Sequence, residues 1–575
     1  MSSYLEQAQE WLNYPNLDEN IRKEISSALN DEEKLKEFFY EPLNFGTAGL
    51  RGIMRAGTNG MNVHTVAHAT QGLANTIIEE NGQSRGVAVS YDSRNNSRLF
   101  AEKTASVLAA NGIKVYMFNE LHPVPALSFA TRHFKCIAGV MITASHNPKE
   151  YNGYKVYWED GAQVPPEHAK KIYDTMKKLD IFNDIKSTDF SSAVSDGKIE
   201  MIGEEFDKIF LSEILKTQIN KDAIRNISDN FKIVYTPLHG SGYRLVPEIL
   251  KMAGAKPENI LTVPEQMILD GNFPTVEKPN PEVKSCFNLG IEIAKKENCD
   301  LVIGTDPDAD RMGIVVKTPN GEFITLSGNQ VGALMVAYII ENMKKNNTLP
   351  SNACVVKSIV STELVNEICK KNNVKLINVL TGFKYIGEKI KEFEQTGEYT
   401  YIFGFEESYG YLSGTYARDK DAIFASMLIA EMAAYYKANN MSLYDALIAL
   451  YKNYGCFKDA VISIKKEGVA AKEEMQKAML KIRENLPREI NNTKVLKVRD
   501  YQSGLITELS TGRTEPTNLP TSDVLFFEMA DNSNLVIRPS GTEPIIKLYF
   551  GIPGKNEDET REKLEKYKEE MIKLL

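Results

Sequence analysis

The sequence has little cysteine and no cluster of it. Its 575 residues include six cysteines without a CxxC pair: Cys136, Cys286, Cys299, Cys354, Cys369 and Cys456. Disulfide-rich secreted domains and cysteine zinc sites need closely spaced cysteines, so neither class is expected. Scattered free thiols suit a reducing compartment, and we expect a cytoplasmic protein.

Long apolar runs and basic blocks are also missing. The longest clean apolar run, VGALMVAYII (331–340), is about half the length of a bilayer-spanning helix. The first residues, MSSYLEQAQEWLNYPN, lack the basic and apolar regions of a signal peptide. No Lys/Arg block offsets the formal net charge of -9, which argues against a nucleic-acid partner. We therefore expect neither a membrane nor a nucleic acid as partner, and no pattern indicates an oligomeric state.

What is present is typical of a globular protein with several domains. Hydrophobic residues make up 42% and charged residues 25% of a chain too long for one core. Near-continuous apolar segments alternate with amphipathic helical segments in three blocks, which is typical of α/β domains. Close-set strands near 524–551 and a helical C-terminus then indicate a different, α+β domain.

The predicted fold is therefore three tandem α/β domains with mixed or parallel sheets around a central cleft, followed by a smaller C-terminal α+β domain. The expected strands of the three blocks and their helices place the domain boundaries near residues 205, 325 and 455. The predicted domains are 1–205, 206–325, 326–455 and 456–575.

Three aspartates alternate directly after an apolar strand in LVIGTDPDADR (301–311). Asp306, Asp308 and Asp310 would repel one another unless a divalent cation lies between them. An EF-hand is excluded because its sixth position would be Arg311 and its twelfth Lys317. An all-oxygen site of this kind suits Mg²⁺ shared with a phosphate, and Arg311 would face an anionic ligand.

A serine follows another apolar strand in GVMITASHNP (139–148). Ser145 and His146 are not a catalytic dyad by adjacency alone, and no GxSxG elbow surrounds the serine. Ser145 alone could be a turn residue, but beside a magnesium loop it makes sense as the carrier of a phosphoryl group. A turn in EYNGY (150–154) would fold Lys155 back towards it.

Two further loops have the residue types that bind phosphate. FGTAGLRG (45–52) places Arg51 among glycines, which favours bidentate phosphate recognition. RPSGTEP (538–544) combines a guanidinium, hydroxyls and accessible backbone N–H groups, with Lys547 on the next strand. GFEESYG (404–410) offers Glu406 and Ser408 as acceptors for sugar hydroxyls, although a structural role is equally compatible with this motif.

Together these motifs resemble the α-D-phosphohexomutase family, in particular its long phosphoglucomutase-like branch. TASHNP is similar to the family's phosphoserine loop, DPDADR to its metal loop, GFEES to its sugar loop and RPSGTEP to its phosphate loop. The resemblance implies that phosphorylated Ser145 joins the three aspartates as metal ligand, and that Arg51 and Lys155 assist catalysis. The implied substrate contacts are Thr47, His146, Arg311, Thr381, Gly382, Glu406, Ser408, Lys420, Arg538, Ser540, Gly541, Thr542 and Lys547.

The resemblance also implies an activity. We expect an enzyme that interconverts glucose 1-phosphate and glucose 6-phosphate, with glucose 1,6-bisphosphate as intermediate and activator and sugar phosphates as its small-molecule partners. Several relatives have a histidine shortly after the sugar-loop serine, whereas Tyr409, Gly410 and Tyr411 follow Ser408 here. Lys155 and Lys420 are therefore the candidates for the general base. Mannose and pentose phosphates stay open as substrates.

Three other functions fit the sequence less well. A haloacid-dehalogenase-type phosphatase would use Asp306 as nucleophile, but it would leave TASHNP without a role. A P-loop is excluded because Glu388 stands where GFKYIGEK (382–389) would need lysine. A non-catalytic sugar-phosphate binding protein is disfavoured because the serine and all three aspartates are present.

Overall fold

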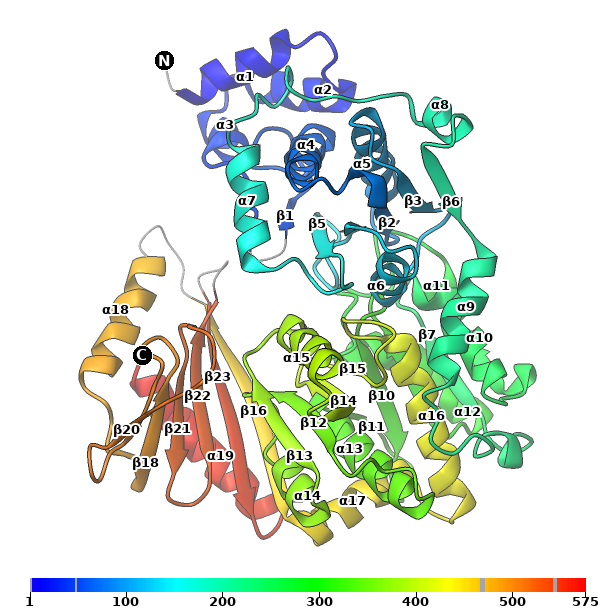
Figure 1. Cartoon of the computed structure of the whole chain (residues 1–575). Coiled ribbons are helices and arrows are strands. Elements are labelled where there is room, and N and C mark those ends of the chain that lie inside the picture. Colours follow the sequence, from blue (N-terminus) through cyan, green and yellow to red (C-terminus); the bar gives the residue numbers. More distant parts are fainter. Residues whose placement is uncertain (1–2, 47–48, 466–470, 541–544) are drawn as a thin grey trace. The chain divides into compact units, whose positions relative to one another are not determined.

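The computed structural model of the chain describes residues 3–46, 49–465, 471–540 and 545–575 (Figure 1). These residues form two compact units. The first unit comprises Met1–Leu326, Gly387–Gln395 and Tyr409–Ser442, and the second comprises Ser327–Ile386, Thr396–Ser408 and Leu443–Leu575. Each is described below by itself.

The first unit begins with helices around Trp11, which is buried against Phe39 and Phe182. A mixed sheet of order β1-β5-β4-β2-β3-β6 follows. Strands β4, β2, β3 and β6 run parallel, while β5 and β1 are antiparallel to their neighbours. The elements of this part are α1 (Ser3–Asn13), α2 (Glu19–Ala28), α3 (Glu32–Phe39), β1 (Gly49–Ile53), α4 (Val63–Glu79), β2 (Val87–Tyr91), α5 (Ser97–Ala110), β3 (Val115–Phe118), α6 (Val124–His133), β4 (Ala138–Ile142), β5 (Tyr151–Trp158), α7 (Pro166–Met176), α8 (Phe190–Ser195) and β6 (Ile199–Ile202).

A second sheet of the first unit has the order β11-β10-β9-β7-β8. Its strand β9 is parallel to β7 and antiparallel to β10. Helix α16, which comes much later in the chain, packs against α10 and contacts β9. The elements of this part are α9 (Glu204–Leu215), β7 (Ile233–Thr236), α10 (Gly242–Met252), β8 (Ile260–Thr262), α11 (Pro264–Met267), α12 (Asn288–Glu297), β9 (Leu301–Thr305), β10 (Met312–Lys317), β11 (Phe323–Leu326) and α16 (Ala422–Ala438).

The second unit combines parallel strands with an antiparallel C-terminal sheet. Strand β12 pairs in parallel with β13 and β14, and the C-terminal strands follow the order β16-β23-β22-β21-β18-β19-β20. Buried side chains such as Ile359, Leu380 and Phe526 form one cluster between these two parts. The elements are α13 (Gly328–Lys345), β12 (Ala353–Ser358), α14 (Leu364–Asn372), β13 (Lys375–Val379), β14 (Thr400–Glu406), α17 (Leu443–Tyr454), β16 (Cys456–Lys465), α18 (Ala471–Glu484), β17 (Glu489–Ile490), β18 (Thr493–Asp500), β19 (Leu505–Glu508), β20 (Thr514–Pro516), β21 (Leu525–Met529), β22 (Asn534–Pro539), β23 (Ile545–Gly554) and α19 (Glu557–Lys573).

The elements predicted from apolar periodicity are present, with bounds shifted by a few residues. Helix α15 (Phe383–Thr396) and strand β15 (Gly410–Leu412) complete the chain, and short 3-10 turns lie at Gln83–Arg85, Arg225–Ile227, Pro257–Asn259 and Lys284–Phe287. The boundaries expected near 205, 325 and 455 stay a prediction.

Candidate active site

The aspartate loop is a tight connection between two buried antiparallel strands, β9 and β10. Its turn places the non-glycine residue Ala309 in the left-handed region, at φ +46°. The Asp306 carboxylate supports the turn, because its Oδ1 accepts hydrogen bonds from the backbone N–H groups of Asp310 (3.1 Å) and Arg311 (3.0 Å). Oδ1 of Asp306 therefore holds the loop, whereas its Oδ2 contacts a residue outside the loop.

Distant elements of the first unit also hold this loop. Three of its consecutive backbone carbonyls each accept hydrogen bonds from a different element. Pro307 O accepts from N and Oγ of Ser241 (2.8 Å each), Asp308 O from N of Val124 (2.9 Å), and Ala309 O from N of Ala422 (3.2 Å). The starts of α10, α6 and α16 thus fix the loop conformation.

The three aspartates are buried together, with ligand oxygens within 4.8 Å of one another. Burial, followed by the charge of Asp308, raises the pKa of Asp306 well above its usual range and raises that of Asp310 as well. For Asp308 burial acts in the same direction, but the Lys155 ammonium outweighs it and holds the pKa below its usual value. Among the described residues, Oδ1 of Asp308 and Oδ1 of Asp310 are buried and accept no hydrogen bond. Buried carboxylate oxygens without donors fit a metal cation, so the trio is a candidate metal site.

Ser145 lies at the same place, immediately beyond β4. Its backbone adopts a left-handed conformation (φ +54°), and its side chain is buried. Ser145 Oγ donates to Asp306 Oδ2 at 3.1 Å and lies 3.1 Å from His146 Nδ1. A non-glycine residue in this conformation costs on the order of 1 kcal/mol or more, so the surroundings must hold it there.

A buried arginine holds the serine loop. Arg94 is fully buried, pairs with Asp92 at 3.3 Å and lies 5.1 Å from the centre of the Phe273 ring. Its two terminal nitrogens donate to four backbone carbonyls of the loop, those of Ser145 (2.6 Å), Asn147 (2.5 Å), Pro148 (2.9 Å) and Tyr151 (3.1 Å). One guanidinium therefore fixes the path of the chain on both sides of the serine.

Thr143 links the serine loop to the aspartates. Its hydroxyl lies 2.6 Å from Asp92 Oδ2 and 3.2 Å from Asp308 Oδ2, and it accepts a hydrogen bond from Ser145 N at 2.8 Å. Asp92 and Thr143 follow the neighbouring parallel strands β2 and β4, so their side chains meet at one sheet edge. The polar residues YDSR (91–94) stand at the end of β2, but the sequence predicted no role for Asp92, Arg94 or Thr143.

Lys155 reaches the aspartates by a different path from the one expected. EYNGY does not form a turn, because Tyr151–Trp158 is one continuous strand, β5. The β4–β5 pairing places Lys155 opposite Met141, and Lys155 Nζ lies 2.9 Å from Asp308 Oδ2 and 4.0 Å from Asp310 Oδ2. Gly153 is needed for packing rather than turning, since a Cβ there would lie 2.5 Å from Thr143 O.

A second lysine contacts the trio. Lys420 Nζ lies 3.1 Å from Asp310 Oδ2 and 2.9 Å from Asp419 Oδ1. Asp419 is buried and also accepts from Tyr157 Oη (2.8 Å) and Gln163 Nε2 (3.2 Å). Burial would raise the pKa of Asp419, but Lys420 holds it below its usual value. Asp419 thus positions Lys420, a role that sequence reasoning missed although the two residues are adjacent.

Two cationic side chains lie near His146, the residue that follows the serine. Burial, followed by Arg311 and Arg51, lowers the pKa of His146 well below its usual value, so its imidazole is neutral. Arg311 also pairs with Glu282 at 2.9 Å and lies 3.8 Å from Asp310. Arg51 is on β1, opposite Gly153, with an exposed side chain.

The remaining candidates belong to the second unit or lie outside the described residues. The Glu406 carboxylate is buried at the end of β14 and accepts from Gly382 N at 2.6 Å, while Thr381 and Ser408 flank this pair in the chain. Arg538 and Lys547 are opposite each other on β22 and β23, and Ser540 N donates to Ile545 O at 2.7 Å. Thr47, Gly541 and Thr542 lie outside the described residues.

Comparison with known proteins agrees with this arrangement. Family models described as phosphoglucomutase/phosphomannomutase alpha/beta/alpha domains I, II and III match residues 42–181, 208–321 and 327–454. The chain belongs to the phosphoglucomutase/phosphomannomutase family. This confirms the family resemblance and the predicted fold class of α/β domains followed by a β-rich C-terminal part.

Individual relatives match along almost the whole chain. A phosphoglucomutase of Staphylococcus saprophyticus is 34% identical over 96% of this chain and 98% of its own length. A phosphoglucomutase of Staphylococcus aureus strain USA300 is 35% identical, over 96% and 97%. The crystal structure of pp63/parafusin, a phosphoglucomutase from Paramecium, has the same fold, with a TM-score of 0.66, 19% identity and coverage of 90% and 92%. No helix of the described residues is long and apolar enough to cross a membrane.

Proposed function

We propose that this protein is a phosphoglucomutase, an isomerase-class enzyme that interconverts α-D-glucose 1-phosphate and glucose 6-phosphate in the cytoplasm. The observation that carries the proposal is the position of Ser145 Oγ, 3.1 Å from the buried aspartate trio. The phosphoglucomutases that match nearly the full chain support the same substrate. Ser145 is the proposed phosphorylated nucleophile.

Asp306, Asp308 and Asp310 would hold Mg²⁺ together with an oxygen on Ser145. Their all-oxygen, carboxylate-rich donor set suits a hard cation. A bound Mg²⁺ would supply charge neutralisation at the phosphoryl oxygens. Lys155 and Lys420 each place an ammonium group against the same carboxylates.

The reaction consists of two phosphoryl transfers. In the first, the P–O bond to Ser145 Oγ breaks and a P–O bond forms to the free hydroxyl of the hexose monophosphate, whose proton passes to a base. The product is glucose 1,6-bisphosphate. After the sugar turns over, its other phosphoryl group passes to Ser145, which restores the phosphoenzyme and releases the isomeric monophosphate. The same bisphosphate, as activator, phosphorylates an unmodified Ser145.

Lys155 and Lys420 are the candidates for the group that takes and returns the proton. Their Nζ atoms lie 2.9 Å from Asp308 and 3.1 Å from Asp310 respectively, and either lysine accepts the proton only in its neutral amine form. Positioning and charge stabilisation provide most of phosphoryl-transfer catalysis. Arg51 supplies a guanidinium for the reacting phosphate, and neutral His146 can donate or accept a hydrogen bond at Ser145 Oγ.

The second unit supplies substrate contacts in this proposal. Thr381, Gly382, Glu406 and Ser408 bind sugar hydroxyls, while Arg538, Ser540 and Lys547, with Gly541 and Thr542, hold the phosphate that is not reacting. Thr47, Arg311 and Lys420 complete the set. Mannose or pentose phosphates remain alternative substrates, because nothing in these contacts selects the gluco epimer.

The test is an assay of glucose 1-phosphate conversion with Mg²⁺ and glucose 1,6-bisphosphate, coupled to oxidation of glucose 6-phosphate. Wild type should turn over and Ser145→Ala should not. Full activity of Ser145→Ala would overturn the proposal, and so would a phosphoenzyme destroyed by hydroxylamine, which marks an aspartyl phosphate. A panel of hexose and pentose 1-phosphates compared by kcat/KM identifies the substrate.

A further inference from the structure

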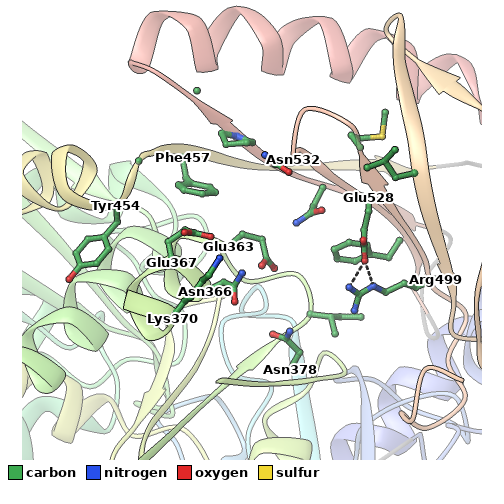
Figure 2. Close-up of a pocket in the computed structure, with 18 of the residues that line it drawn as sticks. Glu363, Asn366, Glu367, Lys370, Asn378, Tyr454, Phe457, Arg499, Glu528 and Asn532 are labelled. Atoms are coloured by element: carbon green, nitrogen blue, oxygen red, sulfur yellow. Dashed lines mark hydrogen bonds and ion pairs between the residues drawn. The ribbon is translucent and has the colours of Figure 1, made fainter. Parts of the chain in front are cut away.

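A polar cavity of about 660 Å³ lies within the second unit, away from every residue assigned above. Helix α14 and strand β13 contribute one side, and the C-terminal sheet contributes the other (Figure 2). The chain segment Tyr454–Phe457, where α17 ends and β16 begins, also lines it, and the cavity is open to solvent. This volume is in the range of small-molecule binding sites, about 300–1,000 Å³.

The register of the C-terminal sheet separates this cavity from the predicted phosphate-binding groups. Asn534, Val536 and Arg538 alternate along β22, so their side chains share one face of the sheet. Asn534 lines the cavity, whereas Arg538 belongs to the proposed phosphate loop four residues away, about 13 Å at the usual strand rise. Val536 lies between them in a buried cluster with Ile359. The cavity is therefore a separate site on the same sheet face.

Three carboxylates, those of Glu363, Glu367 and Glu528, and two cations, Lys370 and Arg499, line the cavity. Arg499 Nε donates to Glu528 at 2.6 Å, and Glu363 pairs with Lys357 at 3.0 Å. Glu367 and Lys370 contribute one charge of each sign from the same helix. A phosphate or other anion would meet three carboxylates here, so the lining favours an uncharged ligand.

The hydrogen-bonding groups that remain are mainly amides beside aromatic rings. Asn366, Asn378, Asn532 and Asn534 line the cavity, together with aromatic side chains that include Phe457 and Phe526. Oδ1 of Asn378 is buried and accepts no hydrogen bond from the described residues. Leaving such an atom without a partner costs roughly 1–3 kcal/mol, which rotation of the Asn378 amide towards a ligand hydroxyl would recover.

We propose that this cavity binds an uncharged carbohydrate, a free hexose or a short oligosaccharide. Amide groups can donate and accept at neighbouring hydroxyls, and aromatic rings provide apolar surface for the C–H faces of a sugar. A nucleoside would also use aromatic rings, but the mostly polar lining favours a ligand with hydroxyl groups over most of its surface. The bound sugar would contact both parts of the second unit.

The experiment titrates glucose, maltose and maltotriose into the full-length protein by calorimetry and saturation-transfer NMR, with adenosine as the comparison ligand. We expect one of the sugars to bind. Asn378→Leu should weaken this binding about fivefold, as for the loss of one neutral hydrogen bond. The control Asn485→Leu should leave it unchanged. Asn485 is an exposed asparagine outside the cavity. If Asn378→Leu lowers the melting temperature, Asn366→Ala on α14 replaces it and should weaken binding similarly.

Three results would overturn the proposal. The first is no sugar binding, or binding unaffected by either cavity variant. The second is displacement of the sugar by glucose 1,6-bisphosphate in direct competition, since that places it at the phosphate-binding site. The third is tighter binding of adenosine than of any sugar. Ser145→Ala should bind the sugar like wild type, so this outcome does not depend on the mutase proposal.

Discussion

Ser145 Oγ and Asp306 Oδ2 lie 3.1 Å apart although 161 residues separate them in the chain. Neither side chain is positioned by its own loop alone. The serine loop depends on Arg94, and the aspartate loop depends on the starts of α6, α10 and α16. Each of these supports can be tested by substitution.

Arg94→Lys should lower kcat by roughly tenfold to a hundredfold, with a smaller effect on KM. A lysine cannot reproduce the planar fork that donates to four carbonyls, so Ser145 would no longer be held in its left-handed conformation. Steady-state kinetics with glucose 1-phosphate measures the change. Arg98→Lys, at an exposed site on α5, is the matched control and should behave like wild type. Equal kinetics for both variants would show that Arg94 does not position the serine.

Lys155→Gln and Lys420→Gln should have different effects on kcat and KM. If Lys155 transfers the proton, its loss should reduce kcat by about 10²–10⁴-fold and change the pH dependence of kcat. Lys420 is held by Asp419 and should affect mainly KM if it contacts substrate. The opposite pattern would make Lys420 the base. Unchanged pH profiles of kcat in both variants would exclude both lysines as the general base.

Mg²⁺ should stabilise the first unit. It would bind the buried carboxylate oxygens that accept no hydrogen bond, and ligands that bind only the folded state raise its stability. Calorimetry with and without EDTA should show a higher melting temperature with Mg²⁺ for wild type. Asp308→Asn should remove this difference, and a Mg²⁺ effect of equal size in that variant would place the ion elsewhere.

Gly153→Ala should destabilise the first sheet by about 1–3 kcal/mol, typical of overpacking. The added Cβ would lie 2.5 Å from Thr143 O and 2.9 Å from Leu50 O, both backbone atoms that cannot move independently. Gly551→Ala is the control, because its nearest neighbour would be 3.6 Å away. Thermal unfolding of both variants gives the comparison, and similar melting temperatures would contradict the packing argument.

Low pH should destabilise the packing of the N-terminal helices. Burial, followed by Lys103, lowers the pKa of His64 from 6.5 to about 4, and its ring packs edge-on against Trp11 and Phe182. Because the unfolded state binds this proton more tightly, stability is retained above pH 6.5 and declines as the pH falls towards 4, by at most about 3 kcal/mol. Tryptophan fluorescence against urea at pH 7 and pH 4.5 measures the loss. His64→Gln should reduce this difference between the two pH values.

Much of this site was predictable because its reactive residues come shortly after apolar strands in the sequence. Asp306 directly follows β9 and Ser145 comes three residues after β4, and these positions after apolar runs led to the predicted magnesium loop and phosphoryl carrier. Arg94 was not predictable in its role, since its partners are backbone carbonyls, which carry no sequence signature. The strand β5 was missed because Tyr151–Trp158 contains Gly153 and Asn152, residues that favour turns unless neighbouring strands enclose them.

The carbonyl of Ala309 receives its hydrogen bond from Ala422, more than a hundred residues later in the chain. During synthesis the aspartate turn therefore emerges long before the segment that fastens it. A ribosome-bound chain that ends before α16 lacks this support, whereas those from Val124 and Ser241 precede the loop in the chain. The order in which the polypeptide is made thus leaves the last of these hydrogen bonds to the loop until most of the chain exists.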